Sequence, residues 1–430
     1  MPEARDGAAL SSGSDLPEWD LSDLYDGPES EALAEDIAVT EDGAKAFREA
    51  YLEKVAALEP AAFGAAIQEY ERLSETLYKF MSYAQLLHAG DVSDPEIGRF
   101  YQSMHERGTV ISSLMLFFTL EINTLDDAVL EAKMVDPVAG RYTPWIRDLR
   151  LFRAHQLTDE MERLLNEKEV AGRSAWMRLF DETIADLRFS IPGKGDALTM
   201  TEALDQFSSP KPEERQVAAE AVAKGLKGKL SLFSRVTNTL AKDKQIEDTW
   251  RNYDHPMASR NLSNQVEDDV VDALVGAVKD SFPRLSHRYY SLKAKWFGMP
   301  TLNFWDRNAP LPDGDDKRYS WSEATETVLG AYGAFSPDLA KVGKRFFDNA
   351  WIDVPVRPGK SPGAFAHPTV PSAHPYLLLN FMGRTRDVMT LAHELGHGCH
   401  QVLAAGQGAL LADTPLTLAE TASVFGEMLT

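Results

Sequence analysis

The chain has 430 residues, of which 44% are hydrophobic and 26% charged, a composition typical of a folded soluble protein. This composition excludes a disordered, a fibrous and a membrane-spanning chain. Sixty-six acidic residues against 44 basic ones give a net charge of −22, so we expect neither nucleic acid nor an anionic membrane as a partner.

The cysteine content and the first residues of the chain indicate the cellular compartment of the protein. The single Cys399 rules out an intramolecular disulfide and is typical of a reducing compartment. The first residues lack the basic and then apolar pattern of a secretory signal, and the longest apolar run, residues 110–120, is too short to span a bilayer. We therefore expect a cytoplasmic protein, while its oligomeric state stays open.

The first 40 residues form an acidic leader. They contain eleven acidic residues and one basic residue, a net charge of −10 and nearly half of the total. The rest of the chain is only moderately acidic.

Residues 41–190 are dominated by helical periodicity. Apolar residues recur there at spacings of three to five, as one face of a helix requires: Ala65, Tyr70, Leu73, Leu77 and Phe80. The pattern is interrupted at Pro192, Gly193 and Gly195, which predict a hairpin or a linker. We therefore predict an N-terminal helical domain over 41–190 and a second domain over 191–430.

Helical patterns resume at Pro212 and give way to short strand-like segments at 351–356 and 375–381, separated by a Gly- and Pro-rich stretch. A further helix follows. The pattern predicts a mainly α fold with a small β-sheet next to that helix.

This helix contains the motif H-E-x-x-H. His393 and His397 are four residues apart, so both imidazoles project from one face, one turn apart, where a single Zn²⁺ can bridge them. Glu394 can reach a metal-bound water without being a ligand itself. The alternative is a half-buried helix whose histidines are merely hydrogen-bonded.

A catalytic zinc site needs a third protein ligand. His400 lies too far along the helix from His393, so we expect it to support the ligands or the fold, and Asp413 is expected in turn or cap chemistry. We predict Glu420 as the third ligand, because it lies on an apolar-faced helix where an unpaired carboxylate is costly. Glu427, two turns later, is expected to hydrogen-bond a ligand.

Several longer runs strongly resemble the M3 family of zinc metallopeptidases in its oligoendopeptidase F branch. They are residues 374–381, 387–397 and 420–427, with shorter matches at 19–25, 259–263 and 305–310. The resemblance implies a two-lobed helical fold whose lobes flank a deep channel, with one Zn²⁺ per chain on the channel wall. It also implies that His393, His397 and Glu420 bind the zinc and that Glu394 is the general base.

The same resemblance implies that short unfolded peptides are the substrates. It places five residues beside the peptide, where a strand edge can pair with peptide backbone: Gly363, Ala364, Phe365, His374 and Tyr376. Ordinary loop and strand structure is an equally weighted alternative for them.

The resemblance also implies a departure in length. Family members run well past the position of Glu427, and their later portion completes the channel and supplies Tyr and His side chains that stabilise the oxyanion. This sequence stops at Thr430 inside a predicted helix, so we expect a truncated chain that binds zinc with weak or no peptidase activity. The alternatives are a non-catalytic zinc- or peptide-binding derivative and a zinc hydrolase of non-peptide amides.

Overall fold

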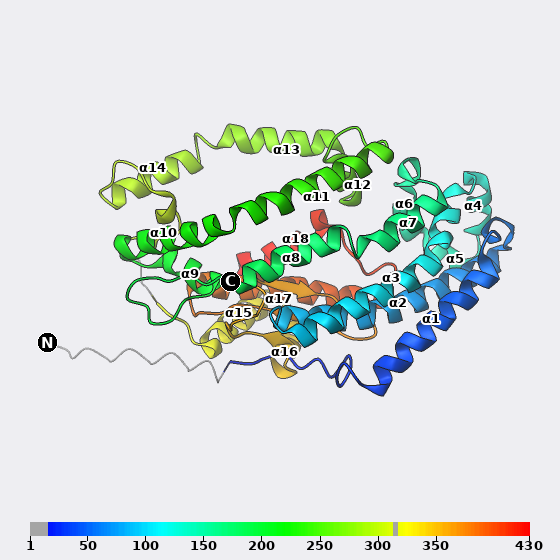
Figure 1. The fold of residues 1–430 in the computed structure, drawn as a ribbon, viewed down its shortest axis with the longest axis horizontal. Helices are drawn as coiled ribbons and strands as arrows, with labels where there is room; N and C mark the ends of the chain where they lie inside the picture. The colour runs from blue at the N-terminus through cyan, green and yellow to red at the C-terminus, as the bar shows by residue number, and fades with distance from the viewer. Residues whose placement is uncertain (1–15, 313–316) are drawn as a thin grey trace.

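The computed structural model describes residues 16–312 and 317–430, and most of the described chain is helical (Figure 1). Three long helices start the fold: α1 (Glu31–Tyr51), α2 (Pro60–Gly90) and α3 (Pro95–Thr124). Proline opens both α2 and α3, and Asp94 caps α3 by accepting hydrogen bonds from the backbone N–H groups of Glu96 and Ile97. Aromatic side chains with no exposed surface, among them Phe47 and Phe118, fill the space between them.

Shorter helices complete this first layer and connect it to the next part of the fold. They are α4 (Asp127–Lys133), α5 (Pro137–Arg141), α6 (Thr143–Arg150), α7 (Asp159–Glu169), α8 (Arg173–Asp186), α9 (Met200–Asp205) and α10 (Pro212–Gly228). Between α8 and α9 the backbones of Phe189 and Leu198 form an antiparallel bridge, which confirms the predicted hairpin. The division of the chain into domains at this point stays a prediction.

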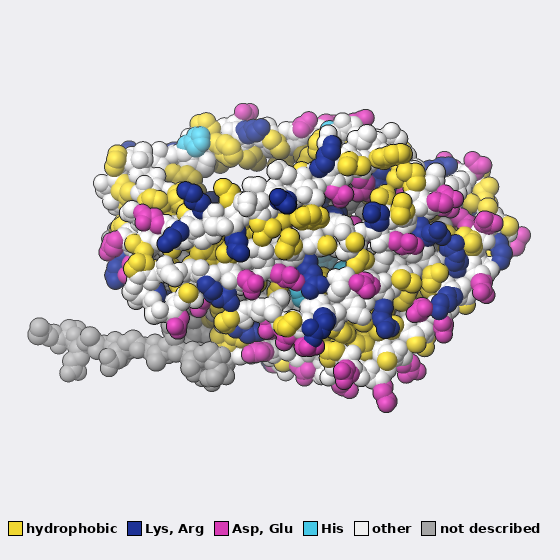
Figure 2. All heavy atoms as spheres, viewed as in Figure 1, with side chains coloured by type: hydrophobic (Ala, Val, Ile, Leu, Met, Phe, Trp, Pro, Cys, Tyr) yellow, Lys and Arg dark blue, Asp and Glu magenta, His cyan; other side chains and the backbone are white. Residues whose placement is uncertain are grey.

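The next four helices form what we call the outer arm, along one long edge of the molecule (Figure 1). It consists of α11 (Leu230–Trp250), α12 (Ala258–Ser263), α13 (Asp268–Ser281) and α14 (Ser286–Trp296). None of the described residues of α13 is buried. Figure 2 shows apolar side chains along this edge and a hollow beneath it.

A small sheet and four helices follow the outer arm. The helices are α15 (Trp321–Phe335), α16 (Pro337–Asp348), α17 (Thr385–Ala404) and α18 (Leu416–Leu429). The strands are β1 (Ile352–Asp353), β2 (Phe365–His367) and β3 (Tyr376–Leu378), in the order β1-β3-β2. β3 is parallel to β1 and antiparallel to β2, with Leu377 opposite Ile352 and Ala366.

The mainly helical fold with a small sheet beside the H-E-x-x-H helix is therefore confirmed. β1 and β3 lie in the two segments predicted as strands, whereas β2 lies in the Gly- and Pro-rich stretch that was expected only to separate them. β2 forms because an antiparallel partner, β3, supplies the hydrogen bonds that the local sequence does not predict.

Part of the acidic leader lies within the described residues. Leu21, Leu24 and Tyr25 are buried, and the Tyr25 hydroxyl donates a 2.6 Å hydrogen bond to Asp36 on α1. The described part of the leader is thus packed against the helices, while residues 1–15 lie outside the described chain.

Within the described ranges, no single helix is both long and apolar enough to cross a membrane. Only α3 and α4 together satisfy the length and composition, and they are bent by 112° at their junction.

Candidate metal centre

The helix α17 is fixed in rotation by its apolar side. Val388, Leu391 and Leu395 are buried against the rest of the core, so the opposite side, which bears the histidines, faces outward. Asp387, in the first turn of α17, supports the start of the helix: its carboxylate accepts hydrogen bonds from the backbone N–H groups of Met382 and Arg384, both at 2.9 Å.

Three side chains converge on one point above this helix. The imidazoles of His393 and His397 lie 5.0 Å apart by ring centroid. One carboxylate oxygen of Glu420, on α18, lies 3.3 Å from Nε2 of His393 and 3.5 Å from Nε2 of His397. A tetrahedral zinc with ligand bonds of about 2.0 to 2.1 Å separates neighbouring ligand atoms by about 3.3 Å, so these distances fit a metal ion.

Two glycines allow α17 and α18 to approach closely. A Cβ at Gly396 would lie 2.6 Å from the carbonyl oxygen of Ala422, and one at Gly426 would lie 2.8 Å from that of Ala392. The Tyr332 hydroxyl lies in the space beside Gly426 and donates a 2.6 Å hydrogen bond to the Ala392 carbonyl. The absence of side chains at Gly396 and Gly426 is therefore what brings Glu420 to the histidines.

Glu394 lies beside the three ligands with 7% of its surface exposed. Burial raises the pKa of its carboxyl group to about 7, and the Glu420 carboxylate contributes in the same direction. His393 and a hydrogen bond from the backbone N–H of Ala366, on β2, oppose the increase. A carboxyl group with this pKa can exchange a proton near neutral pH.

Two further side chains on α18 hold the ligands. Glu427 places a carboxylate oxygen 3.3 Å from Nδ1 of His393, where it can orient the imidazole. The Ser423 hydroxyl donates a 2.7 Å hydrogen bond to the Glu420 carboxylate. Sequence reasoning did not select Ser423, although its position one turn after Glu420 on the same helix was a usable signal.

Two cavities contain a candidate ligand in their lining. Gly363 and Ala364 line one of about 530 Å³ together with His393, Glu394 and Glu427. Its far wall includes Arg384 paired with Asp205 of α9, a contact that joins positions 179 residues apart and that no local pattern predicts. The second cavity, of about 710 Å³, is lined by His397, His400, His374 and His367.

The other three residues expected beside a peptide make contacts within the fold, and His374 also lines the second cavity with His397. Phe365 packs near Trp19, with ring centroids 6.4 Å apart, and Tyr376 is fully buried with its hydroxyl donating to the Asp20 carbonyl. His374 stacks on Trp351, and its Nε2 lies 2.9 Å from the Asp23 carboxylate. The structure therefore places Gly363 and Ala364 in a cavity with the metal-binding residues, and gives Tyr376 a contact within the fold.

Cys399, on the same helix as the two histidines, belongs to the main apolar core. It is buried, and burial raises the pKa of its thiol to about 12. The carboxylate of Asp413 accepts a hydrogen bond from the Thr414 N–H, which is turn chemistry.

Comparison with known proteins adds to this geometry. Residues 206–430, more than half of the chain, match the family model described as Peptidase family M3, and residues 121–189 match the model described as Oligopeptidase F. Oligopeptidase PepF of Bacillus subtilis is 24% identical over 347 residues, which are 78% of this chain and 50% of PepF. An oligoendopeptidase F homolog of Borreliella burgdorferi is 24% identical over 89% of this chain and 64% of its own length.

Solved structures share the fold. A putative oligoendopeptidase F from Bacillus anthracis aligns with a TM-score of 0.72 at 15% identity, covering 92% of this chain and 70% of that one. PZ peptidase A with an inhibitor aligns with a TM-score of 0.73 at 14% identity, covering 97% of this chain and 69% of that one.

The chain spans about half to two thirds of the length of these two curated relatives. The two family models match the chain before and after the hairpin. They confirm the resemblance to the M3 family. The chain therefore belongs to peptidase family M3, in its oligoendopeptidase F branch.

Proposed function

We propose that this chain binds one Zn²⁺ through His393, His397 and Glu420 and hydrolyses peptide bonds of short unfolded peptides, with Glu394 as the general base. The observation that carries the proposal is the pair of 3.3 Å and 3.5 Å separations between Glu420 and the two imidazoles. They match the edge of a zinc tetrahedron.

A bound Zn²⁺ would supply Lewis acidity, polarising a scissile carbonyl and lowering the pKa of a bound water. The protein's part is proton transfer and positioning. Glu394 accepts the water proton and delivers it to the leaving amine, a task suited to a buried carboxyl group with a pKa of about 7. Glu427 and Ser423 hold His393 and Glu420 in place.

The surroundings of the ligands favour a peptide substrate. His393 lines a cavity of about 530 Å³ and His397 lines one of about 710 Å³, so a peptide that occupies both would run past the proposed ligands. β2 is an edge strand, and a peptide can add to it near Gly363 and Ala364. The cytoplasmic location and the weak activity expected of these 430 residues stay predictions.

The experiment combines zinc binding with cleavage of an internally quenched peptide. Glu394→Gln should retain zinc and lose turnover by 1,000-fold or more, since it removes the base and no ligand. Glu420→Ala should lower zinc affinity by roughly 100-fold and Glu427→Ala by roughly tenfold. Glu131→Gln, an exposed change on α4, serves as the matched control.

Three results would contradict the proposal. Peptide cleavage that survives complete zinc removal would exclude the metal-assisted reaction. Zinc loss that is greater for Glu427→Ala than for Glu420→Ala would reverse the ligand assignment. Turnover of non-peptide amides without turnover of any peptide in a panel would identify a different hydrolase.

A further inference from the structure

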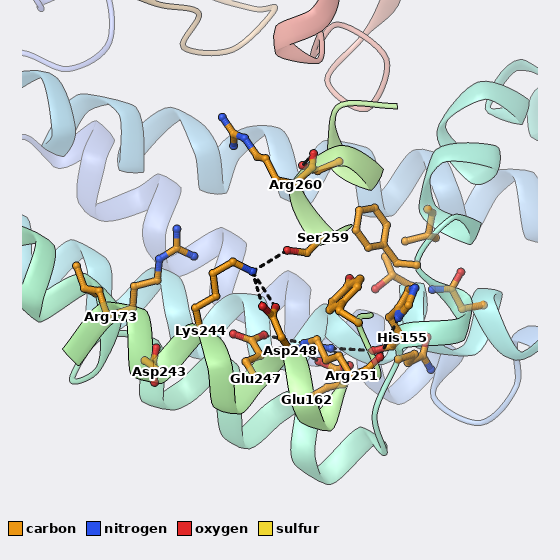
Figure 3. A pocket seen from close by; sticks show the side chains of 18 of the residues that line it. His155, Glu162, Arg173, Asp243, Lys244, Glu247, Asp248, Arg251, Ser259 and Arg260 are labelled. Carbon is orange, nitrogen blue, oxygen red and sulfur yellow. Dashed lines mark hydrogen bonds and ion pairs between the residues drawn. The ribbon is translucent and has the colours of Figure 1, made fainter. Parts of the chain in front are cut away.

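A third cavity, of about 840 Å³, lies away from the metal-binding residues, between the first layer of helices and the outer arm (Figure 3). Its volume is within the range of ligand-binding pockets. Leu120, Phe152, Met177 and Leu240 supply apolar lining. The proposed metal chemistry does not use this cavity, although Ser259, Arg260 and Ser263 of its lining lie in the run 259–263 that resembles the family.

Most of the charged groups in the cavity neutralise one another. Arg251 makes hydrogen-bonded ion pairs with Glu162, at 2.7 and 2.9 Å, and with Glu247 at 2.7 Å. Lys244 is paired with Asp248 at 2.8 Å. Arg251 and Lys244 against Glu162, Glu247 and Asp248 leave a net charge of −1 in this part of the cavity, with no cation of the described chain free there to bind a ligand.

Two arginines differ from this pattern. Among the described residues, neither the Arg173 nor the Arg260 guanidinium has a hydrogen-bond or ion-pair partner, although both line the cavity. Figure 3 shows both at the end away from His155. Asp243 also lines the cavity without a partner among the described residues, so the two guanidiniums exceed it by one charge and favour a ligand that carries a carboxylate, which arginine binds through paired N–H donors.

Two side-chain amides supply the complementary half of a peptide site. The Oδ1 atom of Asn123 and the Oε1 atom of Gln156 are buried and have no hydrogen-bond partner within the described chain, and Asn123 is only 4% exposed. A buried acceptor without a donor is costly, so these oxygens favour a ligand that brings N–H groups. Gln156 follows His155 and hydrogen-bonds the Leu120 carbonyl, which places these acceptors toward the opposite end from the arginines.

The cavity is also connected to the metal-binding helix. Ser263 of α12 lines it, and the carbonyl of the next residue, Asn264, accepts a 2.7 Å hydrogen bond from the Thr417 hydroxyl of α18. Thr417 precedes Glu420 by one helical turn, about 4.5 Å along the axis. The wall of the cavity is therefore hydrogen-bonded to the helix that bears the proposed third ligand.

We infer that this cavity is a second binding site for the substrate peptide, in which Arg173 and Arg260 hold a peptide carboxylate while Asn123 and Gln156 accept backbone N–H groups. The inference rests on the proposed function for the class of ligand, a short peptide. The carboxylate has two sources, the peptide's C-terminus and an Asp or Glu side chain, and the experiment separates them.

The test measures binding in the presence of a chelator, so that no cleavage takes place. Three fluorescein-labelled hexapeptides of Ala and Leu are compared by fluorescence anisotropy on the 430-residue chain: one with a free C-terminus, one amidated, and one amidated with a single internal Glu. The free-carboxylate peptide should bind about tenfold tighter than the plain amidated one. Recovery of affinity by the Glu-containing peptide identifies a side-chain carboxylate as a second source, and lack of recovery identifies the C-terminus alone.

Variants assign the effect to the cavity. Arg173→Ala and Arg260→Ala should each remove the preference for the free carboxylate, and both side chains are exposed, so folding is preserved. Arg107→Ala, an exposed change on α3 outside the cavity, should leave it intact. Asn123→Leu and Gln156→Leu should weaken all three peptides by a similar factor, with thermal unfolding measured to show that the variants are folded.

Equal affinity for all three peptides, or a carboxylate preference that survives both arginine variants, would overturn the inference. The outcome is independent of the proposed chemistry. Carboxylate-dependent binding without any zinc-dependent cleavage would leave this site standing as a peptide site alone. Zinc-dependent cleavage without carboxylate discrimination would remove this site and leave the metal centre.

Discussion

The helices around the metal centre and the helices of the outer arm are stabilised in different ways. α17 contributes Leu391, Leu395 and Cys399 to the same apolar core as the long helices α1 to α3. α13 has no buried residue, and its apolar side chains are exposed by up to 63%, at Leu274. The difference shows that two of the candidate ligands lie on a helix that belongs to the main apolar core.

The outer arm is fastened at its base by a buried ion pair. Arg215 of α10 and Asp306, in the segment after α14, are both at most 1% exposed and are joined by two hydrogen bonds of 3.1 and 2.8 Å. The ammonium group of Lys293 donates to the carbonyls of Arg307 and Ala309, both at 2.7 Å. At this point polar contacts therefore hold the helices together, as apolar packing does around α17.

The largest expected effect comes from breaking that ion pair. Asp306→Ala leaves the Arg215 guanidinium buried without its carboxylate and should lower the free energy of unfolding by about 3 to 5 kcal/mol, measured in urea. Asp348→Ala, which removes a surface pair with Lys344, should change it by less than about 1 kcal/mol. Similar losses for the two variants would show that the arm is not held in this way.

A matched pair of leucines tests the difference in packing. Leu395→Ala creates a cavity beside Gly343 and Leu329 and should lower the free energy of unfolding by about 2 to 5 kcal/mol. Leu274→Ala in the outer arm should stay within about 0.5 kcal/mol of the parent chain. A comparable cost at both positions would mean that α13 is as well packed as α17.

A matched pair of glycines tests the close approach of α17 and α18. Gly396→Ala should push the helices apart, lower zinc affinity by roughly tenfold and destabilise the chain by about 1 to 3 kcal/mol. Gly276→Ala on α13, where nothing lies within 4 Å of an added Cβ, should instead stabilise it by about 0.5 to 1 kcal/mol. Unchanged zinc binding in Gly396→Ala, measured by chelator competition, would remove the glycine contact from the explanation of the site.

The smallest expected effect is on acid stability near the sheet. Burial lowers the pKa of His367 to about 4, and its Nε2 atom has no hydrogen-bond partner in the described chain. Between pH 6.5 and 4 the unfolded chain binds a proton that the folded imidazole does not, so stability is lost as the pH falls. His367→Phe should recover about 1 to 2 kcal/mol of that loss at pH 5, measured by urea unfolding at pH 7 and pH 5.

His287→Phe, an exposed change in the outer arm, is the control for this pH dependence. An identical loss of stability in the His367→Phe and parent chains would show that His367 is not the titrating group.

Features formed by residues close together in the sequence could be predicted, whereas features formed by distant residues could not. The spacing of His393 and His397 within one helix, the hairpin at Phe189 and the strand-like run before α17 are local, and the structure bears out the elements that these patterns predict. Glu420 was selected from its apolar neighbours, and the structure brings it to the histidines, although its role as a ligand stays a prediction.

Features that join distant segments had no comparable signal. The Arg215–Asp306 pair spans 91 residues, and although Asp306 lies in the family-like run 305–310, nothing in that run indicates Arg215 as its partner. β2 depends on a partner strand. The cavity with Arg173 and Arg260 is formed by helices of the first layer and of the outer arm. The closeness of Gly396 to α18 is a property of two packed helices and is invisible in the spacing of either one.

The hydrogen bond between Thr417 and Asn264 has a mechanical consequence. It attaches the end of α12 to the first turn of α18, close to Glu420. A movement of the outer arm would therefore move the start of α18. A displacement of the arm would be transmitted as a tilt of α18 and a change in coordination geometry. The absorption spectrum of a cobalt-substituted protein would then report the position of the arm without any label on it.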